Sequence, residues 1–286
     1  MLLLGCEQRL SPESSGALKL ADPPDSAHGS VAPVQRIVSL APGITELIYA
    51  VGAEQSLLAT VDYADFPEAA KKIPRVGDAF RVDMEKLLAL KPDLVLTWTS
   101  GTPSTTVEQI RALGMRVESM EVKHLSEVSD SLIRIGELTG MQVNARHAAS
   151  EFKSGISELQ SRYRGRRIMS VFVEVNSQPL YTVSGQHVLS EVLQVCGGRN
   201  VLAGLNQLAP IVSTEAVIQA NPDVIISTEG TLRQLQQEWQ SWSQLTAVKQ
   251  NHLYVVSSDT TTRATPRLLQ GTKEVCEALD RARGLL

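Results

Sequence analysis

The segments LLALKPDLVLTW (87–98) and VIQANPDVIIST (217–228) share one organisation, and this repetition decides the fold of the 286-residue chain. Each segment is predicted to end a helix, turn at Pro-Asp and enter a buried strand. Proline cannot continue a helix and disfavours the α conformation of the residue before it, so the turn is fixed at the same point in both copies. Because the copies fall in different halves of the chain, they predict two lobes of similar construction.

Short apolar segments alternate with helical patterns on both sides of the first copy. Such alternation is typical of α/β folds, in which helices cover a parallel sheet. Strands are predicted at 35–40, 56–61, 93–98, 115–120 and 253–257, and helices at 45–51, 84–90 and 107–113. We therefore expect parallel sheets in both halves of the chain.

The segment Asn144–Tyr163 has no proline and is rich in Ala, Glu, Lys, Gln and Arg. As a helix it would span roughly 30 Å, about the width of a small domain. It could be a surface helix of a single domain, but the repeat favours a connector. We expect an α/β fold with two Rossmann-like lobes joined by a single long backbone helix, and a ligand cleft between the lobes. The N-terminal lobe is placed at 35–143, the connecting helix at 144–165 and the C-terminal lobe at 166–286.

The first six residues, MLLLGC, resemble a truncated lipoprotein signal in which Cys6 carries the lipid. An ordinary apolar N-terminus with a stray cysteine is the alternative. Residues 7–34 are rich in Ser, Pro, Ala, Gly and Asp and lack apolar periodicity, which is the composition of a flexible tether. An anchor, a tether and a folded body form a consistent order, so lipidation is favoured. The other two cysteines, Cys196 and Cys276, are then either an even pair in an oxidising compartment or two buried free thiols.

Composition and motifs argue against several classes of function. The net charge is −4 and no long basic run occurs, so a nucleic-acid or anionic-membrane surface is not indicated. No apolar stretch reaches the roughly 18 residues of a transmembrane segment. Walker, dinucleotide, Gly-x-Ser-x-Gly and zinc-binding motifs do not occur in the sequence, so solute binding is a simpler prediction than catalysis. An α/β enzyme with an unrecognised site is the distant alternative.

Three places carry side chains suited to a ligand. Trp98 ends an apolar strand, and ligands of open α/β sheets lie beyond the carboxyl ends of strands, although the ring could also cap its own core. Asp259 and Arg263 follow the strand at 253–257, where carboxylate, guanidinium and hydroxyl groups suit a polar ligand with amides, or form a solvated ion pair. His187 follows a Gly-Gln turn; it could ligate a haem iron, but a structural histidine is preferred.

Five segments together resemble the helical-backbone periplasmic binding proteins of ABC importers, a group that serves siderophore, haem and cobalamin uptake. They are RIVSLAPGITELIYAVG (36–52), VDYADFPEAAKKIPRVG (61–77), LLALKPDLVLTW (87–98), SEVLQVCGGRNVL (190–202) and the loop from Asp259 through RATPR (263–267). The resemblance covers nearly all of the predicted folded body, and the cobalamin-binding branch is the most similar. It implies that Cys196 and Cys276 form a disulfide.

The resemblance also implies a ligand site. Trp98 corresponds to a tryptophan that packs on the corrin ring, and Tyr181 to an aromatic of the second lobe. Asp259 and Arg263 correspond to residues that contact corrin amides. Apolar surface is also expected from Tyr63.

The chain departs from the family pattern at several of these positions. Phe80 substitutes for a tryptophan that the family has nearby, and another family tryptophan is replaced by Ala209. Each lost ring removes about 0.5–1.5 kcal/mol of contact beyond its buried area. A looser corrinoid site, or a ferric-siderophore or haem site of the same fold, is therefore an alternative.

The resemblance also implies that the chain docks on the importer through one acidic residue on each lobe. Glu215 corresponds to the docking residue of the C-terminal lobe. The equivalent residue of the N-terminal lobe is replaced at about Ser104, and Glu108, one helical turn later, is the expected substitute. The chain is thus expected to be a monomeric, extracytoplasmic lipoprotein that delivers cobalamin or a related corrinoid to an ABC transporter permease. It is expected to touch the membrane only through its anchor, without catalysis, metal site or cofactor of its own.

Overall fold

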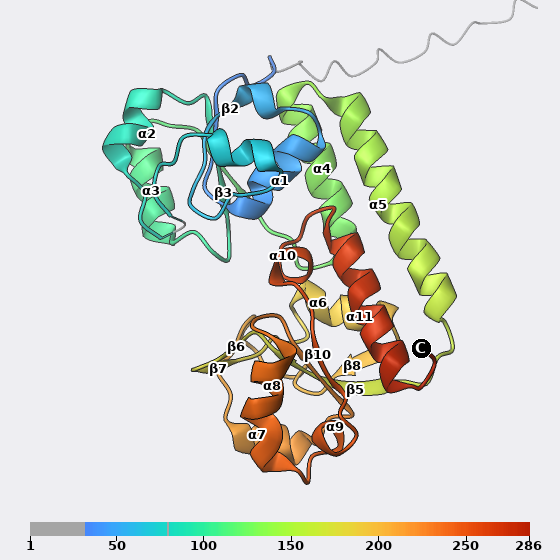
Figure 1. Ribbon diagram of the computed structural model, residues 1–286. Helices are drawn as coiled ribbons and strands as arrows, with labels where there is room; N and C mark the ends of the chain where they lie inside the picture. Colours follow the sequence, from blue (N-terminus) through green and yellow to red (C-terminus); the bar gives the residue numbers. More distant parts are fainter. Residues whose placement is uncertain (1–31, 79) are drawn as a thin grey trace, which may run out of the picture. The chain divides into compact units, whose positions relative to one another are not determined.

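Two four-stranded parallel sheets with the same strand order form the framework of the chain (Figure 1). The computed structural model describes residues 32–78 and 80–286, and Pro33–Leu286 forms one compact unit. The sheet of the N-terminal lobe has the order β2-β1-β3-β4, with β1 (Ile37–Ser39), β2 (Leu57–Ala59), β3 (Leu94–Trp98) and β4 (Val117–Met120). The sheet of the C-terminal lobe has the order β8-β5-β9-β10, with β5 (Met169–Glu174), β8 (Gly198–Asn200), β9 (Val224–Ser227) and β10 (Leu253–Val255). In both sheets the second strand lies on one side of the first and the third strand on the other, so the prediction of two Rossmann-like lobes is confirmed.

The repeated segments that predicted the two lobes occupy equivalent places. Each runs from a helix into the third strand of its sheet: α2 (Met84–Leu90) into β3, and α7 (Thr214–Ala220) into β9. Lys91 and Asn221, each just before the proline, end these helices in the left-handed conformation, at φ +46° and φ +40°. A left-handed residue ends the helical hydrogen-bond pattern, and the proline then prevents the helix from continuing.

The helices of the N-terminal lobe are largely those that the sequence predicts. They are α1 (Pro42–Ala50), α2, α3 (Ser104–Ala112) and α4 (Leu125–Thr139), with short 3-10 helices at Glu54–Ser56 and Glu68–Lys72. α1 begins earlier than predicted because proline, which has a fixed φ and no N–H, fits the first turn of a helix. The sequence prediction missed α4, although Leu125, Val128, Leu132 and Ile135 follow the helical period and are buried.

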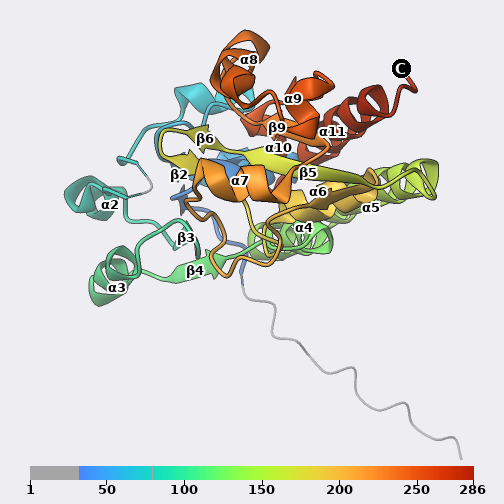
Figure 2. The same ribbon diagram turned by 90° about the horizontal axis from the view of Figure 1, so that it is seen from below.

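Helices cover both faces of the C-terminal sheet (Figure 2). One face packs on α7, α8 (Leu232–Trp239) and α9 (Thr246–Lys249), and the other on α6 (Val188–Val195) and α11 (Leu268–Ala282). The short helix α10 (Ser258–Thr261) joins β10 to α11, a 3-10 helix occupies Gln240–Trp242, and a small hairpin of β6 (Asn176–Ser177) and β7 (Leu180–Tyr181) follows β5. After its carboxyl end β5 thus continues into this hairpin, whereas β9 is followed along the chain by α8.

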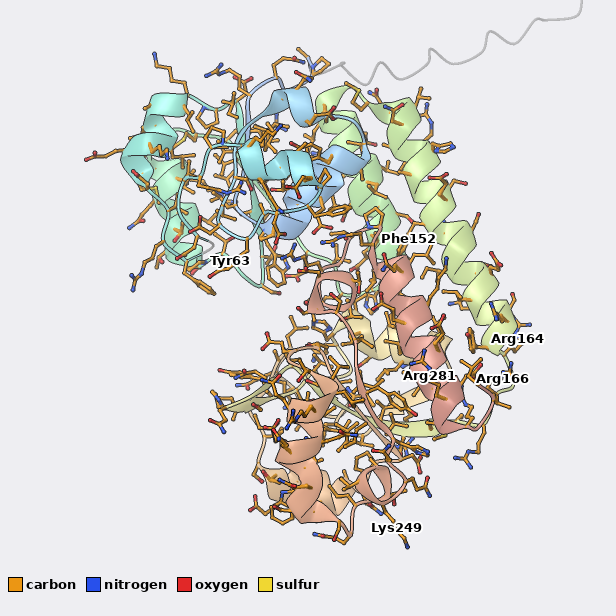
Figure 3. The ribbon with its side chains drawn as sticks, viewed as in Figure 1. Tyr63, Phe152, Arg164, Arg166, Lys249 and Arg281 are labelled. Atoms are coloured by element: carbon orange, nitrogen blue, oxygen red, sulfur yellow. A yellow bond between two sulfur atoms is a disulfide. The ribbon has the colours of Figure 1, made fainter. Side chains whose placement is uncertain are left out.

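The long helix α5 (Gln142–Tyr163) packs into the cores of both lobes. Near its start it contributes Ala145 and Ala149 to the N-terminal core, and from its midpoint onward it contributes Phe152, which is labelled in Figure 3, and Ile156 to the C-terminal core. Gly136 of α4 allows the close crossing of α4 and α5, since a Cβ at that position would lie 2.3 Å from the Cβ of Ala145. The helix predicted at 144–163 is thus present, and its burial in both cores makes it a stiff connection.

A disulfide joins the helices α6 and α11 of the C-terminal lobe. Cys196 follows α6, Cys276 lies within α11, and their Cα atoms are 4.7 Å apart with both residues fully buried. The choice between a disulfide and free thiols, which the residue pattern alone left open, is thereby decided for the disulfide. In the described residues, no helix is both long enough and apolar enough to cross a membrane.

Candidate ligand-binding site between the lobes

A cavity of about 290 Å³ lies where the carboxyl ends of the N-terminal strands meet the C-terminal lobe. Its N-terminal wall includes Pro42, Ile44 and Trp98, and its opposite wall includes Leu208 and Arg263. Pro42 follows β1 and Trp98 ends β3, and the strand order reverses direction between these two strands. Ligands of open α/β sheets bind at such a switch point, which makes this cavity the candidate site.

A wider hollow of about 1000 Å³ lies elsewhere, between α4, α5 and the C-terminal lobe. Its lining includes Phe152, Gln160 and Arg164 of the α5 region and Gln194 of α6. These side chains come from helix flanks and not from the carboxyl ends of strands. We therefore favour the smaller cavity as the ligand site.

Trp98 is held in a defined orientation at the cavity wall. Its side chain is exposed enough to meet a ligand, and its Nε1–H donates to Oε1 of Glu121 at 3.3 Å. Ser100 donates to the other oxygen of the same carboxylate at 2.6 Å. Gly101 packs against the indole, where a Cβ would lie 2.2 Å from a ring carbon. The structure thus places Trp98 at the cavity as the sequence predicts, while its contact with a ligand stays a prediction.

Arg263 lies at the cavity within a group of carboxylates from both lobes. Its Nη1 donates to Oε1 of Glu46 and to Oδ1 of Asp65, each at 3.0 Å, and its Nη2 is 2.9 Å from Oδ1 of Asp259. Arg263 lines the cavity, whereas Asp259 does not. The local Asp259–Arg263 ion pair, which the sequence left as the alternative to ligand binding, therefore exists, and the arginine also joins the lobes; the ligand contacts of both residues stay a prediction.

Glu46 of α1 is the centre of this contact, which we call the inter-lobe clasp (Glu46, Asp65, Asp259, Arg263, Thr265 and Arg267). The Glu46 side chain is only 2% exposed and accepts from Thr265 at 2.9 Å and from Nε and Nη2 of Arg267 at 2.9 and 2.5 Å. The Arg267 guanidinium also lies 4.0 Å from the centre of the Phe66 ring. Sequence reasoning missed Glu46; its acidic side chain among the apolar residues of α1 was the available signal, since a buried carboxylate requires a partner.

The contacts within the clasp shift the pKa values of Asp65 and Arg263. Burial alone would raise the pKa of Asp65, but the hydrogen bond and charge of Arg263 outweigh burial and hold this pKa below its ordinary value. Burial alone would likewise lower the pKa of Arg263, but its bonds to Asp65 and Glu46 raise it. Both groups are therefore charged across the physiological pH range, and the positive charge of Arg263 is already balanced by carboxylates.

Three predicted aromatic contacts lie outside the lining of this cavity. Tyr63, labelled in Figure 3, is 78% exposed and has a left-handed φ of +64°, and Phe80 is 70% exposed. Tyr181 is half-buried in β7, where it pairs with Asn176 and bridges to Ile211. The structure thus brings Trp98 and Arg263 together but leaves these three side chains beyond the cavity wall.

The switch point of the C-terminal sheet carries a buried carboxyl group. Glu174 ends β5, is 3% exposed, and accepts from Nε1–H of Trp239 at 2.8 Å. Burial raises the pKa of Glu174 to about 7, against the opposing effect of the Trp239 hydrogen bond. Thr228, which follows β9, has the only fully buried side-chain polar atom without a hydrogen-bond partner in the described part of the chain. These residues were not predicted, because their burial depends on the packing of α8.

The predicted docking residues are exposed, one on each lobe. Glu108 lies on α3, and Glu215 lies in the first turn of α7. A backbone hydrogen bond and one from Ser213 hold the pKa of Glu215 below its ordinary value, so it is ionised. Cys6, the predicted lipidation site, lies outside the described residues. Within 32–78 and 80–286, no group of three or more His, Cys, Asp or Glu side chains is arranged to hold a metal ion.

Comparison with known proteins agrees with this architecture. The family model described as periplasmic binding protein matches residues 37–260. The chain is 32% identical to a vitamin B12-binding protein of Vibrio vulnificus over 247 residues, 86% of this chain and 90% of that protein. It is 33% identical to a vitamin B12-binding protein of Yersinia pestis over 245 residues, 86% of each.

Solved structures show the same two-lobed arrangement. The vitamin B12-binding protein BtuF of Vibrio cholerae superposes with a TM-score of 0.82 at 31% identity, covering 88% of this chain and 98% of that one. The haem-binding protein HutB of the same organism superposes with a TM-score of 0.74 at 20% identity, covering 86% and 98%, which indicates a shared fold alone. The resemblance that the sequence motifs indicated is confirmed: the chain belongs to the periplasmic binding protein family.

Proposed function

We propose that this chain binds cobalamin or a related corrinoid between its lobes and delivers it to an ABC importer. The observation that carries the proposal is the cavity at the N-terminal switch point, which combines an oriented Trp98 with polar groups of the C-terminal lobe. The similarity to vitamin B12-binding proteins over most of the chain supports the choice of ligand. A corrinoid is the cargo in this proposal and not a cofactor, and no residue is assigned a catalytic step.

The site suits a large, flat ligand with an apolar face and polar edges. The cavity of about 290 Å³ is small for such a molecule, so the ligand would extend beyond it between the lobes. The exposed rings of Tyr63 and Phe80 and the half-buried ring of Tyr181 would then meet its remaining surface. Asp259, whose side chain is 48% exposed, would bind a peripheral amide.

Two exposed carboxylates, the long helix α5 and Cys6 would serve delivery and location. Charge complementarity between the exposed Glu108 and Glu215 and a basic surface of the permease would orient docking. Burial of α5 in both cores favours small movements between the lobes over wide hinge opening. Lipidation at Cys6, followed by the tether at 7–34, would keep the monomeric chain at an extracytoplasmic membrane surface.

Isothermal titration of the purified chain with cyanocobalamin tests the ligand. We expect one-to-one binding, and Trp98→Ala should weaken it by about tenfold or more, because the ring contributes both area and stacking. Trp242→Ala is the matched control: Trp242 is also partly exposed but does not line the cavity, so binding should persist.

Haemin and a ferric hydroxamate provide the competing ligands in the same experiment. Binding of either one without any response to cyanocobalamin would reject the corrinoid and move the ligand to the haem or siderophore branch. Turnover of a substrate, which no described cluster of side chains suggests, would instead favour an enzyme.

A further inference from the structure

His187 is positioned on the wall of the inter-lobe cavity by a network of buried polar groups. It is the N-cap residue of α6 and lines the cavity together with Trp98 and Arg263. The segment before it is fixed by Asn200, whose Nδ2 donates to Val183 O at 2.8 Å. The ring is therefore held in place before any ligand arrives, which reduces the cost of ordering it on binding.

The hydrogen bond at the helix end determines which ring nitrogen carries the proton. Nδ1 of His187 accepts from the backbone N–H of Leu189 at 3.1 Å. A backbone N–H can only donate, so Nδ1 has no proton and the neutral ring carries its proton on Nε2. Burial lowers the pKa of His187 to about 4, so the ring is neutral near pH 7.

The Nε2–H group is available to a ligand. In residues 32–78 and 80–286, no acceptor is bonded to Nε2, and the only fully buried side-chain nitrogen or oxygen without a hydrogen-bond partner is Oγ1 of Thr228. Nε2 of His187 thus keeps contact with solvent. Pro42, Trp98 and Leu208 supply apolar surface to the same cavity, so a ligand acceptor placed there would face little competition from water.

The charges around the cavity favour a neutral hydrogen-bond acceptor on the ligand over a charged one. Arg263 is bonded to three carboxylates, those of Glu46, Asp65 and Asp259. An incoming carboxylate would find no uncompensated cation beside His187 and would lie near negative charge. A neutral acceptor, such as the carbonyl oxygen of a carboxamide, meets no such repulsion and pairs well with a neutral N–H donor.

We propose that His187 donates a hydrogen bond from Nε2 to the carbonyl oxygen of a peripheral amide of the ligand, and that it is not a metal ligand. The assignment rests on the proposed function and deepens it, because it names a specificity residue that the family motifs do not include. Metal ligation through Nε2 would require the proton to move to Nδ1, which would break the bond to Leu189 N–H and leave the helix end without its cap.

Replacement by serine separates this role from helix capping. Serine is a favoured N-cap residue, so His187→Ser keeps an acceptor for the helix but removes the long-reaching Nε2–H. We expect cyanocobalamin to bind about 3- to 10-fold more weakly, the effect of one hydrogen bond, with an unchanged melting temperature of the ligand-free chain. His187→Asn retains a cap and a shorter N–H donor, so its affinity for cyanocobalamin should lie between those of the unchanged chain and of His187→Ser. It provides a second variant if serine impairs folding.

His252→Ser is the matched control. Nδ1 of His252 is also bonded to the backbone, 3.2 Å from Asp223 O, but this ring does not line the cavity. Its replacement should leave cyanocobalamin affinity unchanged. A long-range ¹H–¹⁵N spectrum of the unchanged, ligand-free chain should in addition place the His187 proton on Nε2.

The possible outcomes distinguish this assignment from the proposed function. Tight binding by the unchanged chain with no loss in either His187 variant would overturn the assignment alone. A proton on Nδ1, or a haemin Soret shift that disappears in His187→Ser, would also overturn it, the latter by making the histidine an iron ligand. No cyanocobalamin binding by the unchanged chain would reject the proposed function and this assignment with it.

Discussion

Replacing Glu46 by glutamine should lower the free energy of unfolding by about 3 kcal/mol. Removal of one partner from a buried ion pair costs about 3–5 kcal/mol, because the remaining charge is left uncompensated. The low end applies here: the side chains of Arg263 and Arg267 are each 18% exposed, and Arg263 keeps its bonds to Asp65 and Asp259. Glutamine preserves the volume and one acceptor oxygen, so the loss reports the charge and not a cavity.

Denaturant unfolding at pH 7 without a reducing agent, which leaves the disulfide intact, measures this loss, with tryptophan fluorescence as the signal. For a chain of this size, about 3 kcal/mol corresponds to a fall in melting temperature of roughly 6–12 °C. Glu68→Gln is the control, since its pair with Lys71 is 83% and 53% exposed and solvent screening leaves such a pair with little effect on stability.

A double-mutant cycle tests the clasp itself. Arg267→Met alone should destabilise the chain, whereas Arg267→Met combined with Glu46→Gln should cost less than the sum of the two, because each single change leaves a charge without its partner. A loss in Glu46→Gln no larger than that in Glu68→Gln, or strict additivity in the cycle, would refute the reasoning that the clasp joins the lobes energetically.

Three further outcomes are expected. Alanine at both Cys196 and Cys276 should destabilise the chain by about 4 kcal/mol in the chain-entropy model, a loss that reduction of the unchanged chain with dithiothreitol before unfolding should reproduce. The folded pKa of Glu174, about 7, lies above the ordinary value of 4.5, so the stability it contributes is complete below pH 4.5 and is lost as the pH rises through 7. The unchanged chain should therefore lose about 3 kcal/mol of unfolding free energy between pH 4.5 and 8, and Glu174→Gln should lack this loss. Urea unfolding across that range measures the difference, and the same pH profile in both chains would contradict the raised pKa. Glu215→Lys should reduce cobalamin uptake by cells while leaving the affinity of the purified chain unchanged, and normal uptake would reject docking through this residue.

Local sequence was sufficient for most elements of the N-terminal lobe, for the long helix and for the repeated helix-to-strand segments, whereas α4 and most elements of the C-terminal lobe were not predicted. The Pro-Asp turns after Lys91 and Asn221 fix the entry into the third strand of each sheet through backbone geometry, which acts over a few residues. Trp98 could be placed at a strand end for the same reason. Arg263 could be placed in the loop after the last strand, since its position follows from the order of elements alone.

Contacts between residues far apart in the sequence could not be predicted from local patterns. Glu46 and Arg267 are 221 positions apart, and no local rule shows that they meet. The proton position of His187 depends on the helix that begins beside it, and its access to the ligand cavity depends on the facing lobe. The raised pKa of Glu174 likewise requires the packing of α8 over the end of β5.

The sequence by itself therefore determined the two α/β lobes, the helix between them, the cysteine pair as a candidate bridge and the family resemblance, because these follow from local backbone preferences and short motifs. The tertiary structure decided which charges are compensated, which aromatic rings reach the cavity and which nitrogen of His187 carries the proton. The physical reason is that burial and electrostatic pairing depend on distances between residues far apart in the sequence, which only the folded chain sets.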